Sequence, residues 1–370
     1  MSNRTPQVQS RQRIPRFLLS FFFSCCLCAL AVISLRAQIE SVESATSRYV
    51  WVSNGRLEGR LTLGATPLGA FSRDSSNLAA VVGEKVVLMD PRAADIRKVL
   101  RPHLDGIASL DLKSANFISP HRLFIQGSGR LQAKRKELER FTPPLAFQWD
   151  TEQDALDGKV NTVGAGKDIG SPVYFPQIGY LVFFIEDHFE LWRPATGEGG
   201  RINIPDLKRR PSIFEFSPDG KWLLLAQIAM DTSLDPAVVQ MDGRRFVDSL
   251  RGHKGLVRSV RFSSDSRMVV TACDDGRVRI WSAPGWQLLR TLEGHRGAVA
   301  WAEFSPDGKH VASVGEDKTV RVWSAVDGSL EQTLQESNVP LRTVAFAPNG
   351  EVLAASGEDL VLVWQRRQVN

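Results

Sequence analysis

Residues 250–281, LRGHKGLVRSVRFSSDSRMVVTACDDGRVRIW, decide the fold, because the chain repeats them at once. The second copy, LEGHRGAVAWAEFSPDGKHVASVGEDKTVRVW, spans residues 292–323 and carries each landmark 42 positions later. For example, His253 of the first copy corresponds to His295 of the second. A fixed period of this length is typical of a protein built from repeated supersecondary units.

Each copy consists of short apolar runs separated by turn residues. Ser305 to Gly308 separate two such runs in the second copy, and Asp275 and Gly276 do so in the first. Asp-Gly pairs tolerate the positive φ angles of tight hairpins, so each copy is predicted to form three or four antiparallel strands in a meander. Runs such as MVVTAC (268–273) are apolar on both faces. Each small sheet must therefore be covered on both sides, which radial stacking around an axis achieves.

The two copies resemble the WD-repeat family of β-propellers, most clearly over residues 250–291 and 292–333. In that family a His, a Ser or Thr, an Asp and a Trp of each blade form a buried hydrogen-bonded tetrad. The matching positions are His253, Thr271, Asp275 and Trp281 in the first copy and His295, Ser313, Asp317 and Trp323 in the second. The resemblance implies an all-β propeller in which these residues have structural roles.

The chemistry of such a tetrad explains why these residue types occur together. A carboxylate accepts hydrogen bonds, a neutral imidazole has one donor and one acceptor, a hydroxyl has both, and an indole N–H only donates. In a buried site an unpaired polar group would cost about 1 to 3 kcal/mol. His, Asp and Ser also form catalytic triads, and the geometry of a triad is the test. The recurrence of the set in both copies, each closed by a Trp, favours the structural role.

One aromatic residue that ends the first strand of a unit marks the other blades. It stands at Phe71, Phe175, Phe216, Phe262, Phe304 and Phe346. The long gap after Phe71 leaves room for one more unit, which residues 107–149 supply. This predicts seven blades within residues 48–366. Several blades are degenerate, since Met89 and Val239 stand where the Trp is expected.

The two ends of the ring are expected to meet in one blade. The last unit ends at Trp364 without a fourth strand, which would leave an open sheet edge. Residues 55–63, GRLEGRLTL, resemble the outer strand of another unit, GSLEQTL (328–334). We therefore expect this N-terminal strand to complete the C-terminal blade. Trp51 lies before it much as Trp323 lies before its own outer strand, and either adds an extra strand or packs beneath the ring.

The first 37 residues differ in character from the rest of the chain. Arginines precede the stretch at 17–35, FLLSFFFSCCLCALAVISL, which has no charge. Its length lies between the core of a signal peptide, about 7 to 15 residues, and a spanning helix of about 20. An apolar helix is therefore predicted, either a signal peptide cut after Ala31 or Ala37 or a retained membrane anchor, followed by a linker at 38–47. In both cases the arginines hold the N-terminus in the cytoplasm and place the propeller outside it.

Charge and cysteine content restrict the classes of partner. The chain carries 46 Lys and Arg against 41 Asp and Glu, a net charge of +5. Residues 1–37 contain five arginines and no acidic residue, so the rest has 41 of each sign, which gives no reason to expect a nucleic acid as partner. Three of the four cysteines lie in the apolar stretch and only Cys273 lies in the domain. No disulfide within the domain and no metal site with cysteine ligands is therefore predicted.

A bulge is expected where the first strand of each of the last three units begins. Apolar residues three apart, such as Val257 and Val260, can face the same side of a strand only across a bulge. The bulge would turn the residues between them toward one rim of the ring. The candidate partner-binding residues are Arg258, Trp301 and Arg342 on this rim and Trp286 in a loop. Exposed aromatic residues are typical binding anchors, and packing against a neighbouring blade is the alternative for both tryptophans.

No phosphate loop, GxSxG, HExxH or acidic cluster occurs in the chain, so neither a cofactor nor a metal is predicted. The resemblance implies a non-catalytic scaffold that binds other proteins, located outside the cytoplasm and held at the membrane by residues 17–35 if these are not cleaved. The alternatives are an enzyme or small-ligand binder that uses the axial channel, and a structural component of the cell envelope. The basic insertion at 127–144 is expected to be a charged hairpin or short helix, either solvated or used for docking.

Overall fold

The computed structural model describes residues 49–58, 61–62, 70–131, 145–162, 173–175, 178–185, 187–193, 196, 198–205, 207, 211–228, 235–335, 337–358 and 360–368. The strands they form belong to one compact unit, residues 48–370. Among the described residues no helix has the length and apolar character that crossing a membrane requires.

The strands of the described residues form seven four-stranded antiparallel sheets, called blades 1 to 7 in the chain order of their innermost strands, so that the first strand of the chain belongs to blade 7. Blade 1 has β2 (Leu61–Thr62), β3 (Leu78–Val82), β4 (Lys85–Asp90) and β5 (Asp95–Leu100). Blade 2 has β6 (Ile107–Ser119), β7 (Arg122–Leu131), β8 (Leu145–Asp150) and β9 (Ala155–Thr162). Blade 3 has β10 (Val173–Phe175), β11 (Tyr180–Ile185), β12 (His188–Trp192) and β13 (Gly199–Asn203).

Blades 4 to 7 follow the same plan. Blade 4 has β14 (Pro211–Phe216), β15 (Trp222–Ile228), β16 (Ala237–Gln240) and β17 (Arg245–Ser249). Blade 5 has β18 (Val257–Phe262), β19 (Met268–Cys273), β20 (Arg277–Ser282) and β21 (Leu288–Glu293). Blade 6 has β22 (Val299–Phe304), β23 (His310–Gly315), β24 (Val320–Ser324) and β25 (Leu330–Leu334). Blade 7 has β26 (Leu341–Phe346), β27 (Val352–Gly357), β28 (Leu360–Gln368) and β1 (Tyr49–Glu58).

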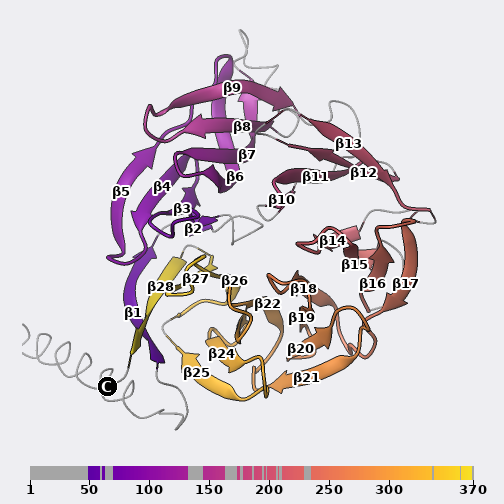
Figure 1. Cartoon of the computed structure of the whole chain (residues 1–370). Helices are drawn as coiled ribbons and strands as arrows, with labels where there is room; N and C mark the ends of the chain where they lie inside the picture. Colours follow the sequence, from indigo (N-terminus) through magenta and orange to yellow (C-terminus); the bar gives the residue numbers. More distant parts are fainter. Residues whose placement is uncertain are drawn as a thin grey trace, which may run out of the picture. The chain divides into compact units, whose positions relative to one another are not determined.

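The core of the protein lies between neighbouring blades. Among the described residues, seven clusters of buried apolar side chains each join two consecutive blades, and the series runs from blade 1 through blade 7 and back to blade 1. In the cluster between blades 5 and 6, for example, Val270 and Ile280 pack with Ala302 and Phe304. Figure 1 shows the sheets following one another around the ring. The strands nearest the centre are β2, β6, β10, β14, β18, β22 and β26. The strands are apolar on both faces because both faces are covered.

The structure confirms the predicted seven-bladed propeller and most of its landmarks. The aromatic marker is the last residue of the inner strand in blades 3 to 7, from Phe175 in β10 to Phe346 in β26. In blade 1, Phe71 forms an isolated bridge with Leu78. Met89 and Val239, which replace the Trp in blades 1 and 4, are fully buried. An aliphatic or thioether side chain therefore fills the same space where the tetrad is lost.

Strand β1 closes the ring, but it begins earlier than the sequence suggested. It pairs antiparallel with β28 over Tyr49–Glu58, with a register break between Ser53 and Gly55. The residues expected at its end, Leu61–Thr62, instead form β2 and start blade 1. Trp51 adds no separate strand, since it lies within β1 with its side chain 7% exposed and its ring 5.7 Å from that of Phe346.

A side chain of blade 6 also bonds to the closing strand β1, in addition to the pairing of β1 with β28. Gln332 on β25 accepts a hydrogen bond from the backbone N–H of Trp51 at 2.8 Å and donates one to the Trp51 carbonyl at 2.9 Å. Its amide therefore pairs with the backbone of Trp51 as a neighbouring strand would. This contact ties the seam of blade 7 to the adjacent blade.

The N-terminal expectations cannot be compared with the structure. The predicted apolar helix at 17–35 and the linker at 38–47 lie outside the described residues, as does most of the basic insertion. Only its first part, residues 127–131, is described, and it is the end of strand β7.

Candidate functional site

The predicted polar clusters of blades 5 and 6 lie at the same end of their sheets. At this end β18 begins, β19 leads into β20 through the turn at Asp274 to Gly276, and β21 ends. Blade 6 repeats the arrangement with the turn at Glu316 to Lys318. The loop that enters each inner strand, which carries His253 or His295, lies beside this turn.

Blade 6 joins its four residues in one hydrogen-bonded chain. The Nδ1 atom of His295 lies 2.9 and 3.0 Å from the carboxylate oxygens of Asp317. Its Nε2 atom lies 2.8 Å from the hydroxyl of Ser313, to which the indole N–H of Trp323 donates at 2.8 Å. The side chains are buried, with His295 2% and Asp317 7% exposed. Because these groups are buried away from water, they form hydrogen bonds with one another instead.

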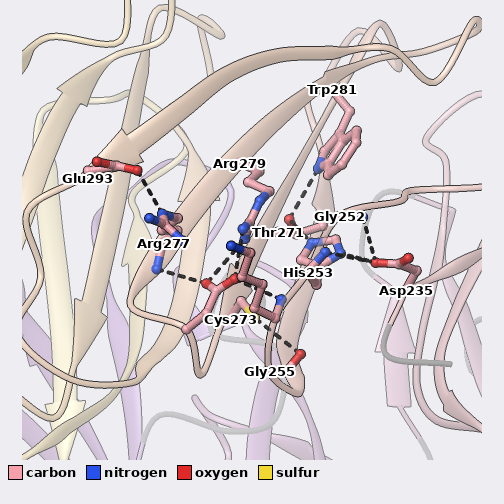
Figure 2. A network of polar contacts seen from close by, with 12 residues as sticks. Asp235, Gly252, His253, Gly255, Thr271, Cys273, Arg277, Arg279, Trp281 and Glu293 are labelled. Atoms are coloured by element: carbon pink, nitrogen blue, oxygen red, sulfur yellow. Dashed lines mark hydrogen bonds and ion pairs between the residues drawn. The ribbon is translucent and has the colours of Figure 1, made fainter. Parts of the chain in front are cut away.

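Blade 5 has the same inner half but a different carboxylate. His253 Nε2 lies 2.9 Å from the hydroxyl of Thr271, which accepts the Trp281 N–H at 3.1 Å. His253 Nδ1, however, contacts Asp235 of blade 4 at 2.9 Å. The same Asp235 oxygen accepts the backbone N–H groups of Gly252 and His253, both at 3.0 Å. Figure 2 shows Asp235 reaching the imidazole from one side and Thr271 lying on the other.

Asp275 was expected beside His253, and the structure corrects this. Arg279 holds it through two hydrogen bonds, of 3.2 Å to Oδ1 and 2.7 Å to Oδ2. Both side chains are buried, at 5% and 6% exposure. Asp275 also accepts the backbone N–H of Lys254 at 3.0 Å. In blade 6 the equivalent Arg321 lies farther from Asp317, at 3.7 Å, and leaves that carboxylate to the histidine.

The protonation states follow from these contacts. Burial lowers the pKa of His253 against the opposing hydrogen bond to Asp235. Burial would raise the pKa of Asp275, but the hydrogen bonds from Arg279 and Lys254 outweigh it, and the pKa is lowered. For Asp317 the burial is likewise outweighed, chiefly by its hydrogen bond with His295, so this pKa is lowered as well. At neutral pH both carboxylates are ionised and His253 is neutral.

His295, Asp317 and Ser313 meet the distances of a catalytic triad, but the hydroxyl is not placed for chemistry. Ser313 is fully buried, as is Thr271 in the other blade. The Ser313 oxygen already accepts the Trp323 N–H. A nucleophile must reach the carbon that it attacks. In this arrangement the groups can orient one another and support the blade.

The expected bulges are present and turn two arginines toward the rim. The register of β18, β22 and β26 breaks between Val257 and Ser259, Val299 and Trp301, and Leu341 and Thr343. Arg258, in the first bulge, is 47% exposed and binds Asp274 through two hydrogen bonds of 2.6 Å. Arg342, in the last, is 70% exposed and lies 3.6 Å from Glu358. Both arginines are accessible at this rim.

The two candidate tryptophans lie elsewhere. Trp301 follows the bulge, is partly buried, and has its ring 4.3 Å from the guanidinium carbon of Arg261. Trp286 lies at the opposite end of blade 5, in the turn between β20 and β21, and is 9% exposed. Its ring contacts that of Trp222 in blade 4 at 5.0 Å. Packing between blades, the alternative stated for both, describes their surroundings.

Sequence reasoning missed Asp235 and Arg279. Asp235 lies in the blade 4 insertion, outside the repeat, so the period that located the other residues gives no indication of it. Arg279 occupies a strand position that reads as one of several arginines in RVRIW (277–281). Its spacing of four residues from Asp275 was the available clue. Among the described residues no group of three or more His, Cys, Asp and Glu side chains is placed to hold a metal ion.

Comparison with known proteins identifies the repeated part of the chain. The family model described as "WD40: WD domain, G-beta repeat" matches residues 244–282 and 286–324. These two matches cover blades 5 and 6, where the polar clusters lie. No curated protein matches the chain.

Proposed function

We propose, from the premise that this chain belongs to the WD-repeat family of β-propellers, that its ring is a scaffold that binds other proteins and has no catalytic activity of its own. WD40 propellers are commonly interaction scaffolds and generally bind other proteins. Family and site together support this function, because a propeller fold alone hosts many activities.

The observation that carries the proposal is the contrast between buried and exposed polar groups at one end of the ring. The histidines and hydroxyls of blades 5 and 6 are buried and bonded to one another. Arg258 and Arg342, at the same end, are exposed and held by Asp274 and Glu358. Exposed ion pairs contribute little to stability, about 0 to 1 kcal/mol. They are therefore available to exchange partners when a protein binds.

The axial-channel alternative has weaker support. Polar side chains do gather on inner strands, namely Glu215, Arg261 and Glu303. However, Glu215 and Glu303 are 2% and 6% exposed, and Glu215 is paired with Arg261. A ligand would have to displace these contacts to reach them.

Charge reversal at the rim tests the scaffold proposal. The double variant Arg258→Glu and Arg342→Glu should lose proteins that co-purify with the parent, at an unchanged melting temperature. The matched control is Arg92→Glu, because Arg92 also lies 3.6 Å from a carboxylate, Glu351, and is 54% exposed. Arg92 follows the end of β4, the end of blade 1 opposite to the bulge rim. Equal binding by both variants, or a hydrolytic activity that depends on Ser313, would contradict the proposal.

We also propose that the propeller acts outside the cytoplasm, since basic residues precede the apolar stretch at 17–35. Intact mass and cell fractionation test this. A mass short by the first 31 or 37 residues in a soluble extracytoplasmic fraction would indicate a cleaved signal peptide. Full-length protein in the membrane fraction would indicate an anchor, and full-length protein in the cytoplasm would contradict the proposal.

A further inference from the structure

Three consecutive blades place charged residues at the same inner-strand position. The residue before the aromatic marker is Glu215 in β14, Arg261 in β18 and Glu303 in β22. In β26 the same position is Ala345. These side chains are largely buried: Glu215 is 2% and Arg261 13% exposed.

Arg261 lies between the other two blades. Its guanidinium forms an ion pair with Glu215 of blade 4. On the other side it lies over the ring of Trp301 in blade 6, 4.3 Å from the ring centroid. The ion pair fixes the guanidinium on one side, and the stacking on the indole fixes it on the other. One cation therefore joins blades 4, 5 and 6.

Glu303 is the second carboxyl group near this cation, and it is incompletely satisfied. It is 6% exposed, and its Oε1 atom is buried without a hydrogen-bond partner, as is the Nε1 atom of Trp301. The backbone N–H of Phe346 in blade 7 and the Arg261 guanidinium both favour the ionised form of Glu303. Two buried carboxylates would nevertheless face one guanidinium, and an uncompensated buried charge is costly.

We propose that this cluster is a proton-binding site in which Glu303 holds one proton in the folded ring while Glu215 is the carboxylate paired with Arg261. The assignment follows from the contacts, because Glu215 has the ion pair and Glu303 has the oxygen without a partner. Among the described residues, the groups that act on Glu303 are Glu215 on β14, Arg261 on β18, Trp301 on its own strand and the Phe346 N–H on β26. None of them supplies a second cation.

Burial makes both carboxyl groups harder to ionise. Burial raises the pKa of Glu303 to about 7. The Arg261 guanidinium, the Trp301 indole and the Phe346 N–H oppose this rise. Burial likewise raises the pKa of Glu215 to about 7, against its ion pair with Arg261. The pair shares one guanidinium, so the second ionisation is the difficult one.

The sign of the pH dependence follows. A carboxyl group whose pKa is raised on folding binds more protons in the folded than in the unfolded chain. Its contribution is fully present below the ordinary value of 4.5 and is lost as the pH rises toward about 7. The folding equilibrium constant should fall by up to about tenfold per pH unit in this window for one such group. The folding stability should therefore fall between about pH 4.5 and 7 through this contact of blades 4, 5 and 6.

The Glu303→Gln variant tests the site, because the amide imitates the protonated acid. Unfolding by denaturant, followed from pH 5 to 8, should show that the folding constant of the variant falls less with pH than that of the parent. Glu358→Gln is the matched control, since Glu358 is 75% exposed and lies in blade 7. The difference between the curves is the measured quantity, which cancels the contribution of His253. Equal curves for the parent and Glu303→Gln would overturn the proposal.

A second measurement begins with the unaltered protein, so that its first result does not depend on how well a variant folds. The infrared absorption of a protonated carboxyl group should be present at pH 6 and disappear by pH 8.5. It should be missing from Glu303→Gln and retained in Glu358→Gln. Absence of the band from the parent at pH 6 would overturn the proposal. A band that is lost in Glu215→Gln but kept in Glu303→Gln would overturn the assignment of the proton to Glu303.

Discussion

In blade 6 the imidazole of His295 contacts a carboxylate of its own blade, whereas in blade 5 the imidazole of His253 contacts a carboxylate of blade 4. The two blades have nearly the same sequence at these positions, and in each the histidine reaches a hydroxyl that also accepts a Trp N–H. The difference lies in the arginine four residues after the aspartate. It binds closely in blade 5 and lies 3.7 Å away in blade 6.

The comparison shows that identical residues do not guarantee identical contacts. Asp275 binds Arg279 and not His253, and Asp235 of the neighbouring sheet contacts His253 in its place. The polar cluster of blade 6 therefore lies within one blade, whereas that of blade 5 connects blades 4 and 5. The stability of blade 5 should depend on a residue outside its own repeat.

The largest effect is expected from Asp275→Ala. It would leave the buried guanidinium of Arg279 without its carboxylate, and breaking a buried pair costs about 3 to 5 kcal/mol. Equilibrium unfolding in denaturant measures this loss. The adjacent Asp274→Ala is the control, because its partner Arg258 is 47% exposed and such pairs are worth about 0 to 1 kcal/mol. A loss of the same size in both variants would remove the distinction between the blades.

Asp235→Ala should destabilise the protein by about 1 to 3 kcal/mol, because His253 Nδ1 and two backbone N–H groups lose their acceptor. Asp317→Ala should have an effect of similar size through His295. A double-mutant cycle between Asp235 and His253 should give a clear coupling energy, and one between Asp275 and His253 a much smaller one. The reverse order would show that blade 5 uses its own aspartate.

Acid should weaken blade 6 through Asp317. Its pKa lies below the ordinary value of 3.8, so its contribution is present above that pH and is lost as the pH falls below it. The slope for one such carboxylate is at most about 1.4 kcal/mol per pH unit. Unfolding free energies measured between pH 5 and 2 should therefore fall less steeply for Asp317→Asn than for the parent. Parallel curves would mean that the His295 contact does not hold the carboxylate in its ionised form.

The smallest effect is expected at the turn after the inner strand, where the blades also differ. Ser266 of blade 5 has φ 62°, and blade 6 has Gly308 with φ 69° at the same place. The Ser266 hydroxyl accepts the N–H of Asp219 in blade 4 at 3.1 Å. Ser266→Gly relieves the strain of a left-handed conformation but loses this bond, so the net change should stay below about 1 kcal/mol.

Ser266→Ala keeps the strained backbone and loses the hydroxyl, so its thermal unfolding should show it to be less stable than Ser266→Gly. If the alanine variant equals the glycine variant, the positive φ angle carries no cost at this position. If the glycine variant is clearly more stable than the parent, the hydroxyl contact between blades 4 and 5 contributes little.

The fold could be predicted from sequence to the extent that it repeats. The period and the markers from Phe71 to Phe346 are set by packing between like sheets, and this gave seven blades. The limits of the closing strand could not be predicted, because residues 55–63 imitate an outer strand while the register is set by pairing with β28. When a strand pairs with a partner distant in sequence, its own residues alone do not determine the register.

The candidate site was predictable in its residue types and less so in its contacts. The spacing located four residues of blade 6, and the structure joins them by hydrogen bonds in the order Asp317, His295, Ser313, Trp323. Competition between partners decides the rest, since Asp275 pairs with Arg279 whereas Asp317 pairs with His295. The burial of Trp286 was also open from sequence, because it depends on Trp222 of another blade.

Strand β1 is synthesised first among the described strands and finds its partner last. Its Trp51 lies opposite Arg366 of β28, and roughly 300 residues must be translated between them, which takes about 15 to 60 seconds at about 5 to 20 residues per second. During this interval an unpaired strand edge is available to other nascent chains. Synthesis of β28, and not the order of the repeats, therefore sets the earliest moment at which the ring can close.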